Sequence, residues 1–187
     1  MTIKIESFKK CLILGVAIVF SGCASYSITE QEMTNYLQDN VSLEQSLGVE
    51  NVMHAQVSVD DLEVKIGRAD ADRISIFANT NADVQMLTLQ KLGLDLDLEF
   101  SAIPHYDQDT GEIFLKSLRL EKLDDHNNLL TPEIKQFIEP AVALIGTALS
   151  NQPVYKLDSA KTQEALLKST DPQLVIKNNK LVIELFN

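Results

Sequence analysis

The sequence TPEIKQFIEPAVALIGTALS, residues 131–150, has the pattern of one long amphipathic helix. Thr131 offers a side-chain acceptor to the first free amides of a helix, and Pro132 suits the first helical position. Pro140 is expected to bend this helix, because its ring removes one backbone hydrogen bond. Apolar side chains recur at spacings of three and four and form one face of the helix: Ile134, Phe137, Ile138, Ala141, Val142, Ile145, Ala148 and Leu149. The pattern predicts a bent helix whose apolar face has to be covered.

Extended segments that precede this helix are predicted to cover it. Apolar and polar residues alternate over 53–66, 74–84, 87–103 and 113–120, which is the period of half-buried strands. The alternation slips at Asp60-Asp61 and near Ser117, where β-bulges would keep the apolar side chains on one face. The third segment would span roughly 55 Å, and antiparallel strands of that length twist and curl.

The predicted fold class is therefore α+β, a long, curled antiparallel meander sheet that wraps the apolar helix 132–150. The polar stretch 39–50 carries no strand prediction, and residues 104–111 are predicted to form a loop. The other expected elements are a short N-terminal helix opened by the capping box Thr29-Glu30-Gln31-Glu32, a short strand at 154–157, a short C-terminal helix ending at Lys168, and a final hairpin that turns at Asn178-Asn179.

The first residues have the features of an export signal. A positively charged start precedes the apolar run 12–20, which is shorter than the roughly 20 residues of a membrane-spanning helix. The run ends in Phe20-Ser21-Gly22-Cys23, which resembles the lipobox of bacterial lipoproteins, with phenylalanine where leucine is usual. The resemblance implies cleavage before Cys23 and covalent attachment of diacylglycerol and an N-acyl chain to this residue. The alternative is an ordinary signal peptide, but no Ala-x-Ala site precedes Ser25.

We therefore expect a lipoprotein signal peptide at 1–22, a lipidated tether at 23–28 and a single α+β domain at 29–187. Several acyl chains anchor a protein durably, whereas one chain holds it only marginally. Ala24 follows the cysteine, and the lipoprotein pattern reserves aspartate at that place for retention in the inner membrane. The resemblance thus implies a lipid-anchored protein on the periplasmic face of the outer membrane.

Composition narrows the class of function. The chain has 27 acidic and 16 basic side chains, a formal net charge of −11, so no nucleic-acid partner is expected. Cys11 leaves with the signal peptide and Cys23 is consumed by lipid, which excludes thiol catalysis, zinc–thiolate sites and disulfides. Residues 107–112 lack ligands that a calcium loop needs, and Asp124-Asp125-His126 lies in a polar loop. We predict no catalytic residue, no metal site, no cofactor beyond the attached lipid, and no enzyme.

A family resemblance runs along the mature chain. The lipobox Cys23 is followed by Tyr26-Ser27-Ile28-Thr29-Glu30-Gln31-Glu32, Ile66-Gly67-Arg68, Gly111-Glu112-Ile113-Phe114-Leu115-Lys116 and Asn151-Gln152-Pro153-Val154-Tyr155. This order resembles that of YceB-like bacterial lipoproteins over essentially the whole mature sequence. The resemblance implies a tubular lipid-binding-like fold, in which a long coiled sheet wraps a helix and can hold acyl chains. It implies no catalytic residues.

Two interpretations remain open for the apolar side chains shared by the third strand and the helix. In the first, the concave face of the sheet exceeds what one helix covers, and a groove holds a lipid or another apolar ligand. In the second, the core is filled, and the protein is a non-catalytic module that docks onto another envelope protein through an exposed patch. The residues expected to line the groove are Leu94, Leu96, Leu98, Phe100, Phe137, Val142 and Ile145.

Overall fold

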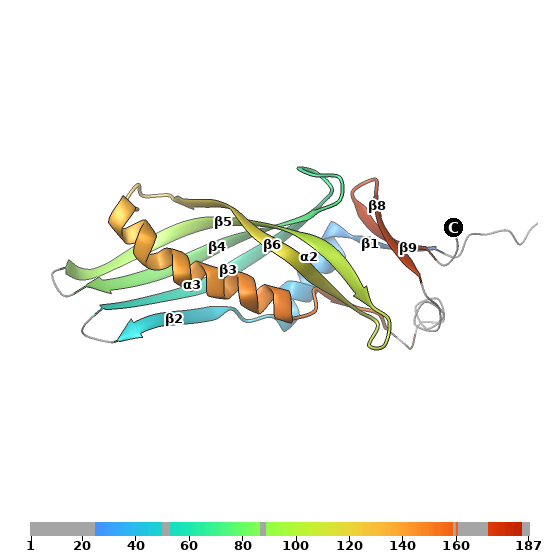
Figure 1. Ribbon diagram of the computed structural model, residues 1–187, viewed down its shortest axis with the longest axis horizontal. Coiled ribbons are helices and arrows are strands. Elements are labelled where there is room, and N and C mark those ends of the chain that lie inside the picture. The colour runs from blue at the N-terminus through green and yellow to red at the C-terminus, as the bar shows by residue number, and fades with distance from the viewer. Residues whose placement is uncertain (1–24, 50–52, 87–88, 159, 161–171, 185–187) are drawn as a thin grey trace, which may run out of the picture.

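The larger of two sheets is an antiparallel meander. The computed structural model describes residues 25–49, 53–86, 89–158, 160 and 172–184 (Figure 1). Within these ranges the strands of the larger sheet stand in chain order, each antiparallel to the next. They are β2 (Glu44–Val49), β3 (Met53–Ile66), β4 (Ile74–Met86), β5 (Leu89–Asp107), β6 (Glu112–Asp125) and β7 (Tyr155–Lys156). The predicted meander is confirmed.

The alternating pattern sets one face of the sheet against the core. On β5 the apolar members of the alternation, Leu94 to Phe100, are each 1% exposed, whereas Asp95 between them is exposed. The predicted irregularities are also present. The register of β3 against β4 shifts between Val59 and Asp61, and Ser117 on β6 has a φ of 51° beside a register shift. Both bulges keep the apolar side chains on the concave face.

Helix α3 (Pro132–Asn151) lies along this concave face. Thr131 caps it by accepting a hydrogen bond from the amide of Ile134, with Pro132 at its start, as predicted. The helix contacts β2 and β3 on one side and β6 on the other, and Figure 1 shows it lengthwise between β2 and β6. Because strands at opposite sides of the sheet reach one helix, the sheet is curled around it, which confirms the predicted fold class. Pro140 lies on the exposed side of α3, and the expected bend stays a prediction.

Two strand predictions were wrong. Residues 44–49, predicted without a strand, pair with β3 as the edge strand β2; this stretch is polar because an edge strand buries little. The predicted loop at 104–111 is shorter, since β5 continues to Asp107. Pro104 is tolerated in β5 because the pairing with β4 ends at Ala102, so its missing N–H costs no ladder bond on that side.

A smaller sheet joins the two ends of the domain. Strand β1 (Ser25–Thr29) pairs with β9 (Lys180–Glu184), which pairs with β8 (Gln173–Lys177). The predicted tether at 23–28 overlaps this strand from Ser25 onward. The predicted hairpin turn is confirmed by φ values of 53° and 57° at Asn178 and Asn179. The predicted C-terminal helix lies almost entirely outside the described residues.

Helix α2 (Glu30–Asn40) packs against the C-terminal part of β3, from Leu62 to Ile66. The predicted capping box is confirmed, since Thr29 and Glu32 exchange hydrogen bonds of 2.8 and 3.2 Å. The carboxylate of Glu30 accepts from the Ile66 amide at 2.8 Å and from both ends of the Arg68 guanidinium at 2.7 Å. The hydrogen bond from Arg68 holds the pKa of Glu30 below its usual value. These contacts fix the start of α2 at the end of β3.

Arg73, directly before β4, forms hydrogen bonds to β5 and to the bulge in β6. Arg73 is 8% exposed, and its guanidinium donates to the Ser101 hydroxyl and carbonyl at 2.9 Å and to the Ser117 carbonyl at 2.7 Å. The Ser101 hydroxyl in turn donates to Glu121 at 2.5 Å. The left-handed backbone at Ser117 is thus held by a buried cation whose direct acceptors are neutral.

We predict that Arg73→Met lowers the free energy of unfolding by about 2 kcal/mol, because three hydrogen bonds from a charged donor are lost in a buried setting. Arg119→Met, at an exposed arginine of the same strand region, is the matched control and should change it by less than about 0.5 kcal/mol. Urea denaturation of the full chain measures both. Equal midpoints for the two variants would show that Arg73 does not hold the bulge.

Candidate functional site

A groove of about 240 Å³ opens between the C-terminal half of α3 and strand β6. It is mostly apolar, and none of its lining side chains is ionisable. The lining residues are Phe100, Leu118, Leu120, Ala143, Gly146, Thr147 and Ser150. The arrangement can hold an apolar group by contact and desolvation, but it offers no acid, base or nucleophile pair for catalysis.

Gly146 sets the distance between the helix and the sheet at this groove. A Cβ placed on Gly146 would lie 3.0 Å from Cδ2 of Leu118 and 3.3 Å from Cε1 of Phe100. Both distances are tighter than ordinary van der Waals contact, so a side chain here would have to displace its neighbours. The missing side chain lets the aromatic ring of Phe100 form part of the groove.

The bulge at Ser117 shapes the opposite wall. After this residue Leu118 is half-buried and Leu120 is 40% exposed, although both belong to the apolar side of the strand. Strand β7 pairs only with Glu112 and Ile113 of β6. Among the described residues, the rest of this edge of β6 has no partner strand, and α3 lies beside it instead. The groove lies where α3 meets the bulged part of β6.

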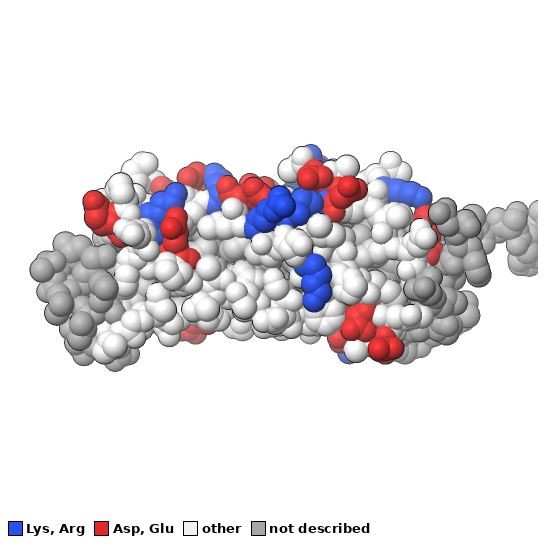
Figure 2. All heavy atoms as spheres, in the orientation of Figure 1, with Lys and Arg blue, Asp and Glu red and all other residues white. Residues whose placement is uncertain are grey.

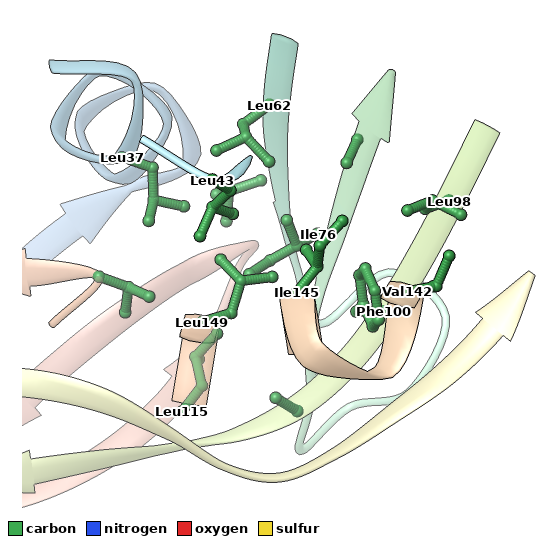
Figure 3. Close-up of a cluster of buried hydrophobic side chains, with 14 of the residues drawn as sticks. Leu37, Leu43, Leu62, Ile76, Leu98, Phe100, Leu115, Val142, Ile145 and Leu149 are labelled. Atoms are coloured by element: carbon green, nitrogen blue, oxygen red, sulfur yellow. The ribbon is translucent and has the colours of Figure 1, made fainter. Parts of the chain in front are cut away.

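Most of the residues predicted to line a groove form the core instead. Leu94, Leu96 and Leu98 are 1% exposed, and Val142 and Ile145 are fully buried. Figure 3 shows Leu98, Phe100, Val142 and Ile145 within one cluster of apolar side chains. Phe137 is partly buried against the same cluster. Of the seven predicted residues, Phe100 is the one that lines the α3–β6 groove, so the predicted lining is corrected to a packed core.

A second feature of the sequence points to the groove that the structure contains. No charged residue occurs from Pro140 to Tyr155, although the exposed face of a helix is normally charged. Ala143, Leu144 and Thr147 are exposed on this part of α3, and Leu144 is 40% exposed. Figure 2 shows a broad uncharged area over the helix, bordered by charged side chains along the β6 edge. The run of uncharged residues was the available signal for this face.

Four further hollows of the described surface are mainly polar. One of about 510 Å³ is lined by acidic residues and His126 near the end of β6, where the His126 Nε2 lies 3.0 Å from Oδ1 of Asp97. Asp125 accepts from the amide of Leu130 at 3.2 Å and so stabilises the turn before α3. Asp107 caps its own turn by accepting the amides of Asp109 and Thr110. Within the described ranges, no three potential metal ligands lie close enough to share an ion.

None of the helices in the described ranges is both long and apolar enough to cross a membrane.

We predict that Gly146→Leu destabilises the protein by about 1–2 kcal/mol, because overpacking against Leu118 and Phe100 outweighs the gain in helix propensity. Ala143→Leu adds the same side chain to the exposed mouth of the groove and should stay within about 0.5 kcal/mol. Chemical denaturation of the two variants measures the difference. A Gly146→Leu protein as stable as its control would mean that helix and sheet are not in the close contact described.

Comparison with known proteins finds bacterial relatives that are named lipoproteins. It is 25% identical over 181 residues to the uncharacterized lipoprotein YceB of Escherichia coli (strain K12), with 92% of each chain covered. It is 24% identical over 186 residues to the uncharacterized lipoprotein YceB of Salmonella typhimurium, with 94% of this chain and 95% of the relative covered. The resemblance to YceB-like lipoproteins is confirmed.

Among solved structures, the crystal structure of lipopolysaccharide binding protein aligns with a TM-score of 0.34 at 13% identity. The alignment covers 86% of this chain and 48% of that one, so the chain spans about half the length of this neighbour. The family model described as "Protein of unknown function (DUF1439)" matches residues 28–180. Since this match covers most of the sequence, the chain belongs to the DUF1439 family.

Proposed function

We propose that the protein is a lipoprotein, anchored through Cys23 to the periplasmic face of the outer membrane, that binds a lipid or another apolar ligand beside α3. The observation that carries the proposal is the α3–β6 groove, with Phe100 at its base and Gly146 leaving room above it. This groove replaces the sheet-centred groove expected from the sequence, whose residues are buried in the core.

The size of the groove limits what it can hold. Its volume of about 240 Å³ lies below the several hundred Å³ of a pocket for a drug-sized molecule. Each methylene that is fully removed from water contributes about 0.8 kcal/mol. A segment of one acyl chain fits these dimensions, with its remaining carbons covered by the exposed apolar side chains Leu120 and Leu144. Two chains side by side do not fit.

The position of Cys23 supports the anchor. Strand β1 begins at Ser25, so the chain from the cysteine to the first described residue spans at most about 7 Å. A lipid on Cys23 would therefore hold the β1 end of the domain close to the bilayer. The relatives in Escherichia coli and Salmonella typhimurium carry the name lipoprotein, which favours the same anchoring here.

A second candidate function rests on the same surface. The uncharged face formed by Ala143, Leu144 and Thr147 is also what a non-catalytic module would use to dock onto another envelope protein. The docking function also predicts a filled core beneath this face of α3, and the core is packed. Crosslinking in intact cells separates the two functions, because only the docking module requires a reproducible protein partner at α3.

We predict that native mass spectrometry of the full chain, extracted in a mild detergent, shows an adduct of lipid mass. Ala143→Trp places an indole in the mouth of the groove and should lower the fraction bound roughly tenfold, through the loss of about two buried methylenes. Gln136→Trp, at an exposed position of α3 that does not line the groove, is the matched control and should leave the adduct unchanged. A ligand-free mass, or an adduct that Ala143→Trp does not affect, contradicts the proposal.

We also predict that Cys23→Ala moves the protein from the membrane fraction to the soluble fraction, because its acyl chains are then missing. Cys11→Ala is the control, since this cysteine lies within the predicted signal peptide and carries no lipid. Fractionation of cells that express each variant measures the outcome. An unchanged membrane-bound fraction for Cys23→Ala would show that Cys23 does not anchor the protein.

A further inference from the structure

Strand β6 carries basic side chains next to the apolar wall of the groove. Lys116, Arg119 and Lys122 are exposed and are sequence neighbours of Leu118 and Leu120, which line the groove. This is unusual in a chain with 27 acidic and 16 basic residues. Figure 2 shows basic side chains interspersed with acidic ones along the β6 edge, beside the uncharged area over α3.

Two of these cations have no carboxylate partner. Lys122 is paired with Asp124 at 2.9 Å. Lys116 lies over the ring of Phe114, 5.8 Å from its centroid, and within the described part of the chain neither Lys116 nor Arg119 forms an ion pair. The nearest carboxylate along the strand, that of Glu121, already accepts the hydroxyl of Ser101 at 2.5 Å. The charges of Lys116 and Arg119 are therefore available to a ligand.

A third cation lies beneath the same bulge. The buried guanidinium of Arg73 donates to the carbonyl of Ser117 at 2.7 Å and otherwise to Ser101. Its direct acceptors are neutral, so no contacting carboxylate cancels its charge. Along this part of β6, Lys116, Arg119, Lys122 and Arg73 stand against the carboxylates of Glu99, Glu121 and Asp124, which leaves an excess of one positive charge. The positive region borders the groove at the edge of β6 that β7 leaves unpaired beyond Ile113.

We propose that the ligand is a single-chain anionic amphiphile. Its acyl chain lies between α3 and β6, and its anionic headgroup lies at the β6 edge between Lys116 and Arg119. The inference rests on the proposed groove and adds the chemical class of the ligand. The one-chain size of the groove selects against two-chain lipids, and the two unpaired cations select an anionic headgroup over a zwitterionic one of equal chain length.

The test compares two lysophospholipids with the same acyl chain, lysophosphatidylglycerol and lysophosphatidylcholine, added to the full chain in a mild detergent and measured by native mass spectrometry. The anionic probe should bind roughly tenfold more tightly, as expected for two cations near a surface headgroup. Lys116→Gln combined with Arg119→Gln should remove this preference and leave the binding of the zwitterionic probe unchanged. Lys91→Gln combined with Lys180→Gln, two exposed lysines outside the groove, is the matched control and should keep the preference.

The outcomes separate the two proposals. Equal binding of both probes, blocked by Ala143→Trp, would overturn the headgroup inference and leave the groove in place. No binding of either probe would overturn both. Inorganic phosphate is the third probe: it should not displace lysophosphatidylglycerol at matched concentration, and displacement would show that the anion alone is recognised.

Discussion

The apolar stripe of α3 packs against the concave face of the sheet, and this contact determines how the sheet curls. The stripe contains Ile138, Ala141, Val142 and Ile145, all fully buried. A flat sheet would cover such a helix on one side only. Because α3 contacts β2 and β3 as well as β6, the sheet has to curl, and its bulges at Asp60-Asp61 and Ser117 allow this curl while keeping the alternation of side chains intact.

The groove follows from the same packing. Gly146 brings α3 close to Phe100 and Leu118, and the irregular part of β6 after Ser117 supplies Leu118 and Leu120 as the other wall of the narrow apolar groove. Arg73 fixes this bulge from behind by bonding Ser101 and Ser117. Arg73, which stabilises the bulge, therefore lies in the same part of the sheet as the leucines of β6 that line the groove. Substitutions in this part of the sheet are therefore expected to change both the stability of the fold and the binding of a ligand in the groove.

The sequence predicted the elements whose signals are local. The helix at 132–150, the capping box at Thr29, the bulges and the Asn178-Asn179 turn each follow from spacing or from one residue's backbone preference. Strand β2 could not be predicted, because its pairing with β3 rather than its own polar pattern makes it a strand. The groove lining was misplaced for a similar reason: periodicity shows which side chains face inward, but not that Leu94 and Val142 fill that interior completely. The charge-free run from Pro140 to Tyr155 was the overlooked signal.

Hydrogen exchange of the full chain tests most directly whether α3 is the centre of the curled sheet. If it is, the amides of α3 from Ile138 to Leu149 exchange only through global unfolding, with the same opening free energy as those of β4 and β5. Exchange of α3 at a distinctly lower free energy, while β4 and β5 stay protected, would show that the helix is a peripheral element and would contradict the account.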